Sequence, residues 1–177
     1  DLAKFGIRPG LERILSLLSR LGDPQKKYKT IHVTGTNGKG STCSFLRQIL
    51  IEDGLSVGGF NSPELLDFRE QITVNNTMIS KEEVTLLFHE ISAAIHRMKE
   101  EGKRLPSKFE IIVCLSFLFF VYKRCDIVVI EVGLGGRDDA TNVIPAALVT
   151  VLTTISLEHT ELLGNTLSEI TSVKAGI

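Results

Sequence analysis

The stretch KTIHVTGTNGKGSTCSFL, residues 29–46, decides the fold class of this 177-residue chain. It opens with a β-branched run typical of a buried strand, passes through three glycines, and continues into an apolar segment that predicts a helix. This arrangement favours phosphate binding, because backbone N–H groups and the helix dipole both attract an anion. The spacing is shorter than the common G-x-x-x-x-G-K-[ST] loop, since only Thr36 and Asn37 separate Gly35 from Gly38.

Bulk composition is that of an ordinary globular domain, with 43% hydrophobic and 23% charged residues. A net charge of -1 gives no surplus of cations to neutralise nucleic-acid phosphates. The longest apolar run, residues 111–122, is too short to span a bilayer, and we expect no signal peptide. The three cysteines are widely spaced in apolar surroundings, which predicts buried reduced thiols. We therefore expect a cytoplasmic protein with no nucleic-acid or membrane partner. We also expect a monomer, although composition does not decide the oligomeric state.

Strand and helix patterns alternate along the chain, which predicts an α/β fold of P-loop type with a mainly parallel sheet flanked by helices. In the helix expected after the glycine loop, we predict that Phe45, Ile49 and Leu50 point inward. Ser80 and Glu83 form a capping box before another helix, and residues 61–80 predict a long ordered loop or short hairpin. The other segments are helices at 11–21, 41–54, 81–102 and 108–124, and strands at 30–35, 56–60, 125–133 and 146–155.

The glycine loop contains side chains suited to phosphate chemistry. Lys39 supplies a mobile positive charge, and the hydroxyl of Ser41 or Thr42 is a possible ligand for a magnesium ion that bridges phosphates. The alternative interpretation is a glycine-rich turn with a surface lysine.

Glu131 ends an apolar strand, which places its carboxylate at the sheet edge where open α/β folds bind ligands. A structural hydrogen-bond network at the end of the sheet is the alternative role for this glutamate.

Among the four histidines, His159 is the candidate for a functional role, because it follows a strand at the same expected edge as Glu131. A lone histidine is nevertheless more often structural than a ligand. His32 lies within a strand and is expected in the core, while His89 and His96 are expected on the surface of a helix. Lys174 has no feature of composition or spacing that singles it out.

Seven segments occur together in an order that resembles the folylpolyglutamate and dihydrofolate synthases of the Mur-ligase superfamily. They are GLERILSLLSRLGDPQ, IHVTGTNGKGS, NSPEL, KFE, EVGLGGRDDATNV, EHTELLGNTLSEI and KAGI, and the resemblance covers nearly the whole chain. The resemblance implies a ligase in which ATP phosphorylates a substrate carboxylate, and the amino group of L-glutamate then attacks the acyl phosphate. It also implies that the short glycine loop is the family's own form of phosphate loop.

The resemblance implies roles for individual residues. It assigns nucleotide binding to Thr36, Asn37, Gly38, Lys39, Gly40, Ser41 and Thr42. Magnesium binding falls to Ser41, Ser62, Glu131 and His159, and the catalytic set is Lys39, Glu131, His159 and Lys174. Lys174 matches a lysine that the family carries as a carbamate formed with CO2. Phe109 and Asp139 match positions that line the pterin pocket, although a core aromatic is an equal interpretation of Phe109. The implied substrates are ATP, L-glutamate, and folate or dihydropteroate.

Two residues and the chain length depart from the family pattern. Glu64 stands where the family usually has a histidine after Ser-Pro, and Glu158 replaces the aspartate that commonly precedes the histidine. The resemblance implies that residues 1–177 are an N-terminal ATP-binding domain, incomplete at its C-terminal end, without the C-terminal glutamate-ligase domain. We therefore expect no ligation by this chain alone. The remaining alternatives are a muropeptide ligase of the same superfamily, a P-loop nucleotide switch, and a non-catalytic α/β scaffold.

Overall fold

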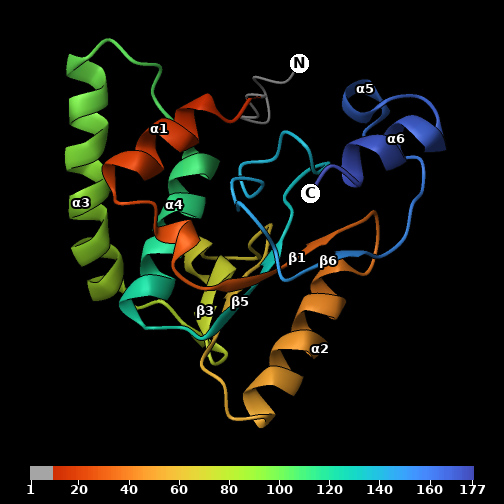
Figure 1. Cartoon of the computed structure of the whole chain (residues 1–177), viewed down its shortest axis with the longest axis horizontal. Helices are drawn as coiled ribbons and strands as arrows, with labels where there is room; N and C mark the ends of the chain where they lie inside the picture. The colour runs from red at the N-terminus through yellow and green to blue at the C-terminus, as the bar shows by residue number, and fades with distance from the viewer. Residues whose placement is uncertain (1–9) are drawn as a thin grey trace.

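The computed structural model describes residues 10–177, which fold around one six-stranded sheet of order β4-β3-β2-β5-β1-β6 (Figure 1). The strands are β1 (Lys29–Thr34), β2 (Val57–Phe60), β3 (Ile72–Val74), β4 (Thr77–Met78), β5 (Ile127–Glu131) and β6 (Val149–Leu152). Strands β2, β5, β1 and β6 are parallel, while β3 and β4 form an antiparallel hairpin beside β2. The predicted α/β class with a mainly parallel sheet is confirmed.

Helices cover both faces of this sheet. They are α1 (Glu12–Arg20), α2 (Lys39–Glu52), α3 (Lys81–Glu100), α4 (Lys108–Tyr122), α5 (Thr160–Leu163) and α6 (Leu167–Lys174), with 3-10 turns η2 (Pro24–Lys26) and η3 (Phe68–Gln71). Helices α1, α3 and α4 pack over one face in the larger core cluster, and α2 packs on the other face in the smaller one (Figure 1). Among residues 10–177, no helix is long and apolar enough to cross a membrane.

Capping boxes set where three helices begin. The expected Ser80–Glu83 box starts α3, and equivalent boxes of Ser107 with Glu110 and of Thr166 with Glu169 start α4 and α6. In each box the cap hydroxyl accepts a backbone N–H and the glutamate accepts the N–H of the cap residue, which satisfies two donors that the helix leaves free. A cap of this kind contributes about 1 kcal/mol to stability. The box of Ser107 with Glu110 therefore helps to set where α4 begins, and Phe109 lies in its first turn.

The prediction for the buried face of α2 was wrong at two positions. Phe45 is 70% exposed and Ile49 is 65% exposed, whereas Leu50 packs on the smaller core. The buried face instead runs through Cys43, Leu46, Leu50 and Ile51, at the 3-, 4- and 1-residue steps that line one side of a helix. Apolar residues occur on all sides of α2, so their positions in the sequence did not single out the inner face.

Several smaller predictions can be compared with the structure. His32 is 1% exposed, His89 and His96 are exposed, and all three cysteines are free and buried, as expected. Residues 61–80 contain η3 and the β3–β4 hairpin, which confirms the hairpin interpretation. The last strand is shorter than the expected range 146–155: β6 covers only Val149–Leu152 and forms one edge of the sheet, paired with β1 alone within residues 10–177.

The register of the parallel strands brings the candidate residues to one end of the sheet. Val33 of β1 lies opposite Glu131 of β5, and Thr34 lies opposite Leu152 of β6. The connections that follow these three strands therefore start side by side at the carboxyl edge, where open α/β sheets bind ligands. These connections contain the glycine loop, the segment Gly133–Ala140 and the segment Thr153–His159.

Candidate nucleotide and substrate site

The glycine loop after β1 is held in place by the segment after β6. Thr36 N–H donates to the carbonyl oxygen of Thr154 at 2.7 Å, and Asn37 N–H donates to Thr154 Oγ1 at 3.1 Å. Thr153 Oγ1 donates to the carbonyl oxygen of Asn37 at 2.8 Å. A Cβ on Gly35 would lie 1.9 Å from Thr153 Oγ1, and Gly35 has φ +141°, so this position requires glycine. No local sequence pattern indicates that these threonines hold the loop.

The first turn of α2 presents the donors that suit an anion. Gly38 is the N-cap in the left-handed region, and its lack of a side chain leaves the first N–H groups of the helix uncapped. Lys39 Nζ donates to the carbonyl oxygens of Gly35 at 2.9 Å and Thr36 at 3.0 Å, which folds its charge back over the loop. Ser41 is exposed in the same turn. These groups together form an anion site at a helix N-terminus.

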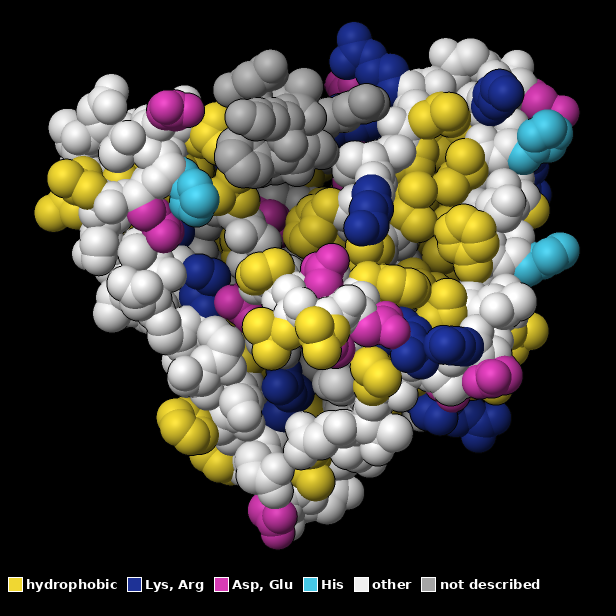
Figure 2. All heavy atoms as spheres, turned by 180° about the vertical axis from the view of Figure 1, so that it is seen from behind, with side chains coloured by type: hydrophobic (Ala, Val, Ile, Leu, Met, Phe, Trp, Pro, Cys, Tyr) yellow, Lys and Arg dark blue, Asp and Glu magenta, His cyan; other side chains and the backbone are white. Residues whose placement is uncertain are grey.

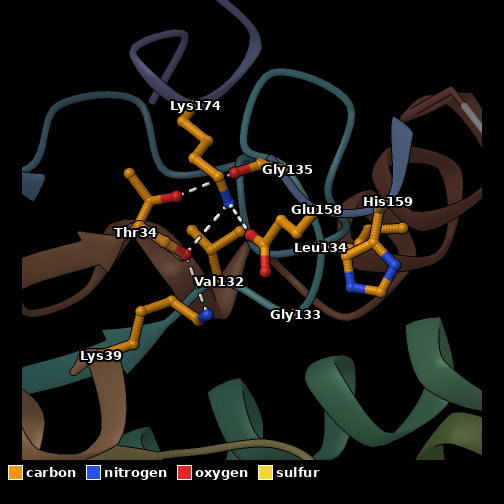
Figure 3. Close-up of a pocket in the computed structure, with 10 residues that line it drawn as sticks. Thr34, Lys39, Val132, Gly133, Leu134, Gly135, Glu158, His159 and Lys174 are labelled. Carbon is orange, nitrogen blue, oxygen red and sulfur yellow. Dashed lines mark hydrogen bonds and ion pairs between the residues drawn. The ribbon is translucent and has the colours of Figure 1, made fainter. Parts of the chain in front are cut away.

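Lys174 is brought to the same loop from the end of α6. The side chain is only 2% exposed, and its Nζ lies 2.7 Å from Glu158 Oε1 and donates to the carbonyl oxygen of Gly35 at 3.0 Å (Figure 3). Burial raises the pKa of the Glu158 carboxyl, but the ion pair with Lys174 outweighs burial and leaves that pKa below its usual value. A lysine without a signal in composition or spacing thus lies at the centre of the site.

A small cavity of about 30 Å³ lies where these segments meet, and Lys39, Glu158, His159 and Lys174 all line it. Figure 3 shows the Glu158 carboxylate directed toward Lys174, with the His159 ring on the other side of Glu158. His159 is exposed and begins α5 with a left-handed backbone at φ 45° and ψ 41°. The structure therefore brings three of the four expected catalytic residues to one cavity.

Glu131, the fourth expected catalytic residue, lies beside the first turn of α2. It is 5% exposed, and its Oε2 would be 3.6 Å from a Cβ on Gly40. Asn61 Nδ2 donates to Glu131 Oε2 at 2.7 Å, and Arg47 Nη1 donates to Asn61 Oδ1. Arg47 and Asn61 therefore orient the carboxylate, a role that sequence reasoning missed. The available signal was that Asn61 directly follows β2 at the same edge of the sheet.

The residues expected to bind magnesium do not form one cluster of side chains. Within the described range 10–177, no three His, Cys, Asp or Glu side chains are grouped so that they could hold a metal ion. Ser41 lies in the first turn of α2 and Glu131 of β5 lies beside that turn, while Ser62 lines a larger cavity and His159 lines the small one. Hydroxyl and carboxylate oxygens beside a phosphate site nevertheless suit Mg²⁺, which binds through few protein oxygens and keeps phosphate and water ligands.

A larger cavity of about 600 Å³ adjoins the small one, because Gly133 and Leu134 line both. Its wall combines the loop at residues 62–64, the first turn of α4, the segment at residues 133–140, and parts of α5 and α6. Seen from behind in Figure 2, the molecule is hollowed between the α5–α6 lobe and the remainder. A cavity of this size accommodates a small organic ligand.

Phe109 and Asp139, the two expected substrate-binding residues, both line the larger cavity. The Phe109 ring centroid lies 6.1 Å from that of Phe60, and a Cβ on Gly133 would be 2.6 Å from Phe109 Cζ, so the ring rests against the glycine segment. Phe109 thus packs on the core and also lines the larger cavity, and its role in substrate binding stays a prediction. 

The Asp139 carboxylate is tied to its own loop. Oδ1 accepts hydrogen bonds from Thr141 N at 2.9 Å and from Thr141 Oγ1 at 2.6 Å, and Oδ2 accepts one from Leu134 N at 2.8 Å. Burial raises the pKa of Asp139. Because Thr141 Oγ1 gives its single proton to Asp139, it must accept from His32 Nε2, 2.8 Å away, which fixes the Nε2–H tautomer of that histidine. This buried chain connects β1 with the cavity wall.

A glycine loop before a helix N-terminus, at the carboxyl edge of a parallel sheet, defines a nucleotide-binding domain of the P-loop class. More specifically, the chain belongs to the Mur ligase middle domain family, which matches residues 33–177.

Relatives and solved structures agree with this family. A dihydrofolate synthase/folylpolyglutamate synthase of Bacillus subtilis is 46% identical over 98% of this chain, which covers 40% of that protein. An FPGS complex with AMPPCP and folate superposes with a TM-score of 0.91 at 38% identity, over 96% of this chain and 42% of the other. E. coli FolC with DHPP and ADP gives a TM-score of 0.88 at 38% identity, over 96% and 39%. The chain thus spans about 40% of the length of these proteins.

Proposed function

We propose that this chain is the ATP-binding part of an amide ligase that adds L-glutamate to the carboxylate of folate or dihydropteroate. The observation that carries the proposal is the shared wall of the two cavities, where Gly133 and Leu134 separate the phosphate loop from a space of about 600 Å³. A phosphate donor and a carboxylate acceptor must lie next to each other for an acyl phosphate to form. The relatives that hold AMPPCP with folate, or ADP with DHPP, support both occupants.

In this proposal the phosphates lie over the first turn of α2. The N–H groups from Gly38 to Ser41 donate to phosphate oxygens, while Lys39 leaves the carbonyl oxygens of the loop to follow the transferred phosphoryl group. Thr42 starts the intrahelical hydrogen bonds, because its N–H donates to the carbonyl oxygen of Gly38. Thr36 and Asn37 shape the loop, since Thr154 already occupies their N–H groups.

Magnesium, when bound, neutralises charge that builds up on the phosphoryl oxygens. We assign Ser41 as its ligand beside the helix N-terminus. Ser62, Glu131 and His159 would hold a second ion only if these side chains, which lie apart in the structure, came together around it. Asn61 supports this assignment for Glu131, because it occupies Oε2 and orients the carboxylate. Ligands of a metal ion are commonly oriented by such hydrogen bonds from neighbouring residues.

Lys174 has two possible forms in this proposal. In the structure its ammonium is paired with Glu158 and buried beside the loop. We infer that the neutral amine adds to the carbon of CO2 and loses a proton, which converts a cation into a carbamate anion. That anion would face Glu158 and therefore needs the nucleotide site's cations to balance its charge. The acyl phosphate chemistry would then take place between Lys39, His159 and the carbamate.

The larger cavity would hold the ring system of the substrate, with Phe109 against its face and Asp139 in the wall. Glutamate would come from the direction of the remaining part of the protein, which in the relatives makes up more than half of the length. We propose that residues 1–177 bind nucleotide but do not complete ligation alone. The three buried free thiols support a reducing compartment such as the cytoplasm, and we propose a monomer.

The test measures glutamate-dependent ADP release by the complete protein that contains this chain. Dihydropteroate, tetrahydrofolate and a muropeptide precursor are offered in parallel with ATP and Mg²⁺. Release with either pteridine substrate supports the proposal, whereas release with only the muropeptide identifies a cell-wall ligase instead. Turnover that is independent of all three substrates identifies a nucleotide switch. A Lys39→Met variant of the same protein controls for contaminating ATPases.

A further inference from the structure

The hydroxyl of Thr34, the last residue of β1, holds a buried carbonyl group in the wall of the small cavity. Thr34 is 1% exposed, and its Oγ1 donates to the carbonyl oxygen of Gly135 at 2.8 Å (Figure 3). Gly135 belongs to the segment after β5, so this bond joins two neighbouring connections at the carboxyl edge of the sheet. Both residues line the cavity together with Lys39 and Lys174. The bond therefore lies in the wall of the phosphate site.

Thr34 is itself fixed at the base of the phosphate loop. Its carbonyl oxygen accepts from the N–H of Thr153 at 2.9 Å. It directly precedes Gly35, whose carbonyl oxygen accepts from Lys39 and Lys174. A β-branched side chain has few allowed rotamers, so the hydroxyl has a defined direction from a fixed backbone. The hydroxyl thus relates the position of the wall to the position of the loop.

The wall segment around Gly135 depends on such a bond, because glycines have no side chains to hold it by packing. Gly135 has φ +70°, and a Cβ there would lie 3.0 Å from Leu163 Cδ2. A Cβ on Gly136 would lie 2.7 Å from the carbonyl oxygen of Lys174. Glycine is required where the segment passes α5 and α6, and glycine leaves the backbone conformationally free. The Thr34 bond therefore helps to decide where the Gly135 peptide points.

A second contact joins the same face of β1 to the other end of this segment. His32 lies two residues before Thr34, and side chains two apart in a strand share a face. The His32 ring lies 2.8 Å from Thr141 Oγ1, and that hydroxyl donates to Asp139. Strand β1 therefore holds the segment at Gly135 and again at Thr141. The phosphate loop, which continues β1, and the wall of the larger cavity are thus built on one strand.

We propose that Thr34 is a positioning residue for phosphoryl transfer, whose hydroxyl holds the wall at residues 133–136 at the correct distance from the phosphate loop. This inference rests on the proposed function and adds a residue to it. Gly133 and Leu134 line both cavities, so a shift of this wall changes the distance between the nucleotide and the substrate carboxylate. A misplacement of about 1 Å can reduce a rate by about 100-fold. The hydroxyl acts through the wall and needs no contact with either ligand.

Binding of the two ligands depends on other contacts. The phosphate loop has its own clamp, because Thr153 and Thr154 bond to Asn37. Phe109 packs against Phe60, away from the Thr34 hydroxyl bond. Loss of this hydroxyl should therefore leave both affinities nearly unchanged and slow the transfer step. Such a split between rate and affinity distinguishes positioning from ligand binding.

The experiment measures the single-turnover rate of ADP formation by the complete protein with ATP, Mg²⁺, glutamate and a pteridine substrate, dihydropteroate or tetrahydrofolate. Thr34→Val keeps the shape of the side chain without the hydroxyl, and it should lower this rate by about 10- to 100-fold. Its affinities for AMPPCP and for the pteridine should stay within about threefold of the wild type. Thr34→Ser restores the donor and should recover the rate to within about threefold.

Thr30→Val is the matched control. Thr30 lies on the same strand and is also 1% exposed, but its Oγ1 has no hydrogen-bond partner among residues 10–177. The same substitution at this position should therefore leave the rate at its wild-type value. Thr34→Ala removes the hydroxyl with a smaller side chain, and it replaces Thr34→Val in the test if that variant does not fold.

The outcomes separate the inference from the proposed function. If ADP formation by the wild type does not depend on the pteridine, the proposed function fails and the inference fails with it. If it depends on the pteridine and the variant without the Thr34 hydroxyl keeps the rate of the control, only the inference fails. A loss of affinity that accounts for the slower rate also refutes it, because Thr34 would then hold a ligand. A Thr34→Ser rate as low as that of the hydroxyl-free variant refutes it as well.

Discussion

Lys39 and Lys174 donate to the same acceptor, the carbonyl oxygen of Gly35, at 2.9 and 3.0 Å. Two ammonium groups from distant parts of the chain thus meet at one backbone atom of the phosphate loop. Among residues 10–177, the carboxylate that pairs with one of them is Glu158, which lies 2.7 Å from Lys174. Lys39 donates its hydrogen bonds to carbonyl oxygens, and its charge also acts on the nearby Glu158 carboxylate, so it can exchange the carbonyl contacts for a phosphate.

Replacement of Lys39 by methionine should weaken binding of a non-hydrolysable ATP analogue by about 10- to 100-fold, because a charge-assisted hydrogen bond contributes about 1.5–3 kcal/mol. The free energy of unfolding should change less than the affinity, because the two carbonyl oxygens that accept from the lysine can be solvated instead. Calorimetry measures the affinity, and Lys29→Met, at an exposed position of β1, is the control. Equal losses in both variants would show that the effect is general electrostatics.

Gly35→Ala should abolish nucleotide binding and destabilise the chain by more than about 3 kcal/mol, because the new Cβ would clash with Thr153 at 1.9 Å. Gly54→Ala is the matched control: it also has positive φ, at +86°, but its Cβ would meet nothing within 4 Å. The control should lose only about 1 kcal/mol from backbone strain. Chemical denaturation measures both changes, and similar losses would contradict the clash with Thr153.

The two predictions above depend on two kinds of feature: local patterns that the sequence shows, and contacts that depend on the order of the strands. The glycine loop, the β-branched strand before it and the capping boxes are local patterns, so the sequence alone predicts the fold class and the anion site. The clamp from Thr153 and Thr154 depends on strand order, because β6 lies next to β1 although it is more than a hundred residues away. A local sequence pattern carries no information about contacts between residues so far apart in the chain.

The side-chain network around Glu131 shows the same limit. The position of Glu131 at a sheet edge follows from its apolar strand, but the support from Asn61 and Arg47 requires knowing that β2 pairs with β5. The inner face of α2 could not be predicted either, because its apolar side chains surround the helix. Lys174 was expected in the site only because the chain resembles a known family. Its buried ion pair with Glu158 depends on how α6 packs, which the sequence does not show.

Carbamylation of Lys174 should increase when Glu158 is replaced by glutamine, because the Glu158 carboxylate stabilises the ammonium form that cannot react with CO2. The partly exposed ion pair is worth about 1 kcal/mol, which corresponds to about a fivefold rise in the carbamate at equilibrium. The carbamate carbon can be followed by NMR in ¹³C-bicarbonate. Lys174→Arg must lack the signal, and the exposed Glu161→Gln should leave it unchanged; a signal retained in Lys174→Arg would refute the assignment.

Burial of His32 should make the folded state less stable in mild acid. Burial lowers its pKa from 6.5 to about 4, so on acidification the unfolded state takes up a proton before the folded state does. The contribution of neutral His32 to the free energy of unfolding is therefore complete above about pH 6.5. It falls by roughly 3 kcal/mol as the pH drops to about 4. His32→Gln, which keeps a donor toward Thr141, should flatten this part of the curve.

Urea denaturation at several pH values measures the His32 effect as the difference between the variant and the wild type. Subtraction removes the contribution of Asp139, whose raised pKa acts in the opposite direction by favouring proton uptake in the folded state. His96→Gln, at an exposed position on α3, is the control and should reproduce the wild-type curve. Parallel curves for wild type and His32→Gln would show that His32 does not titrate with folding.

Strand β6 forms the edge of the sheet next to the phosphate loop, and Val149, Thr150 and Leu152 on it are exposed. Its outward N–H and C=O groups have no strand partner within residues 10–177, so it presents a template for edge-to-edge pairing. When the chain is handled at high concentration, self-association should begin at this edge. Because β6 leads directly into Thr153 and Thr154, the threonines that clamp the glycine loop, pairing at this edge would act on the residues that hold the loop in place.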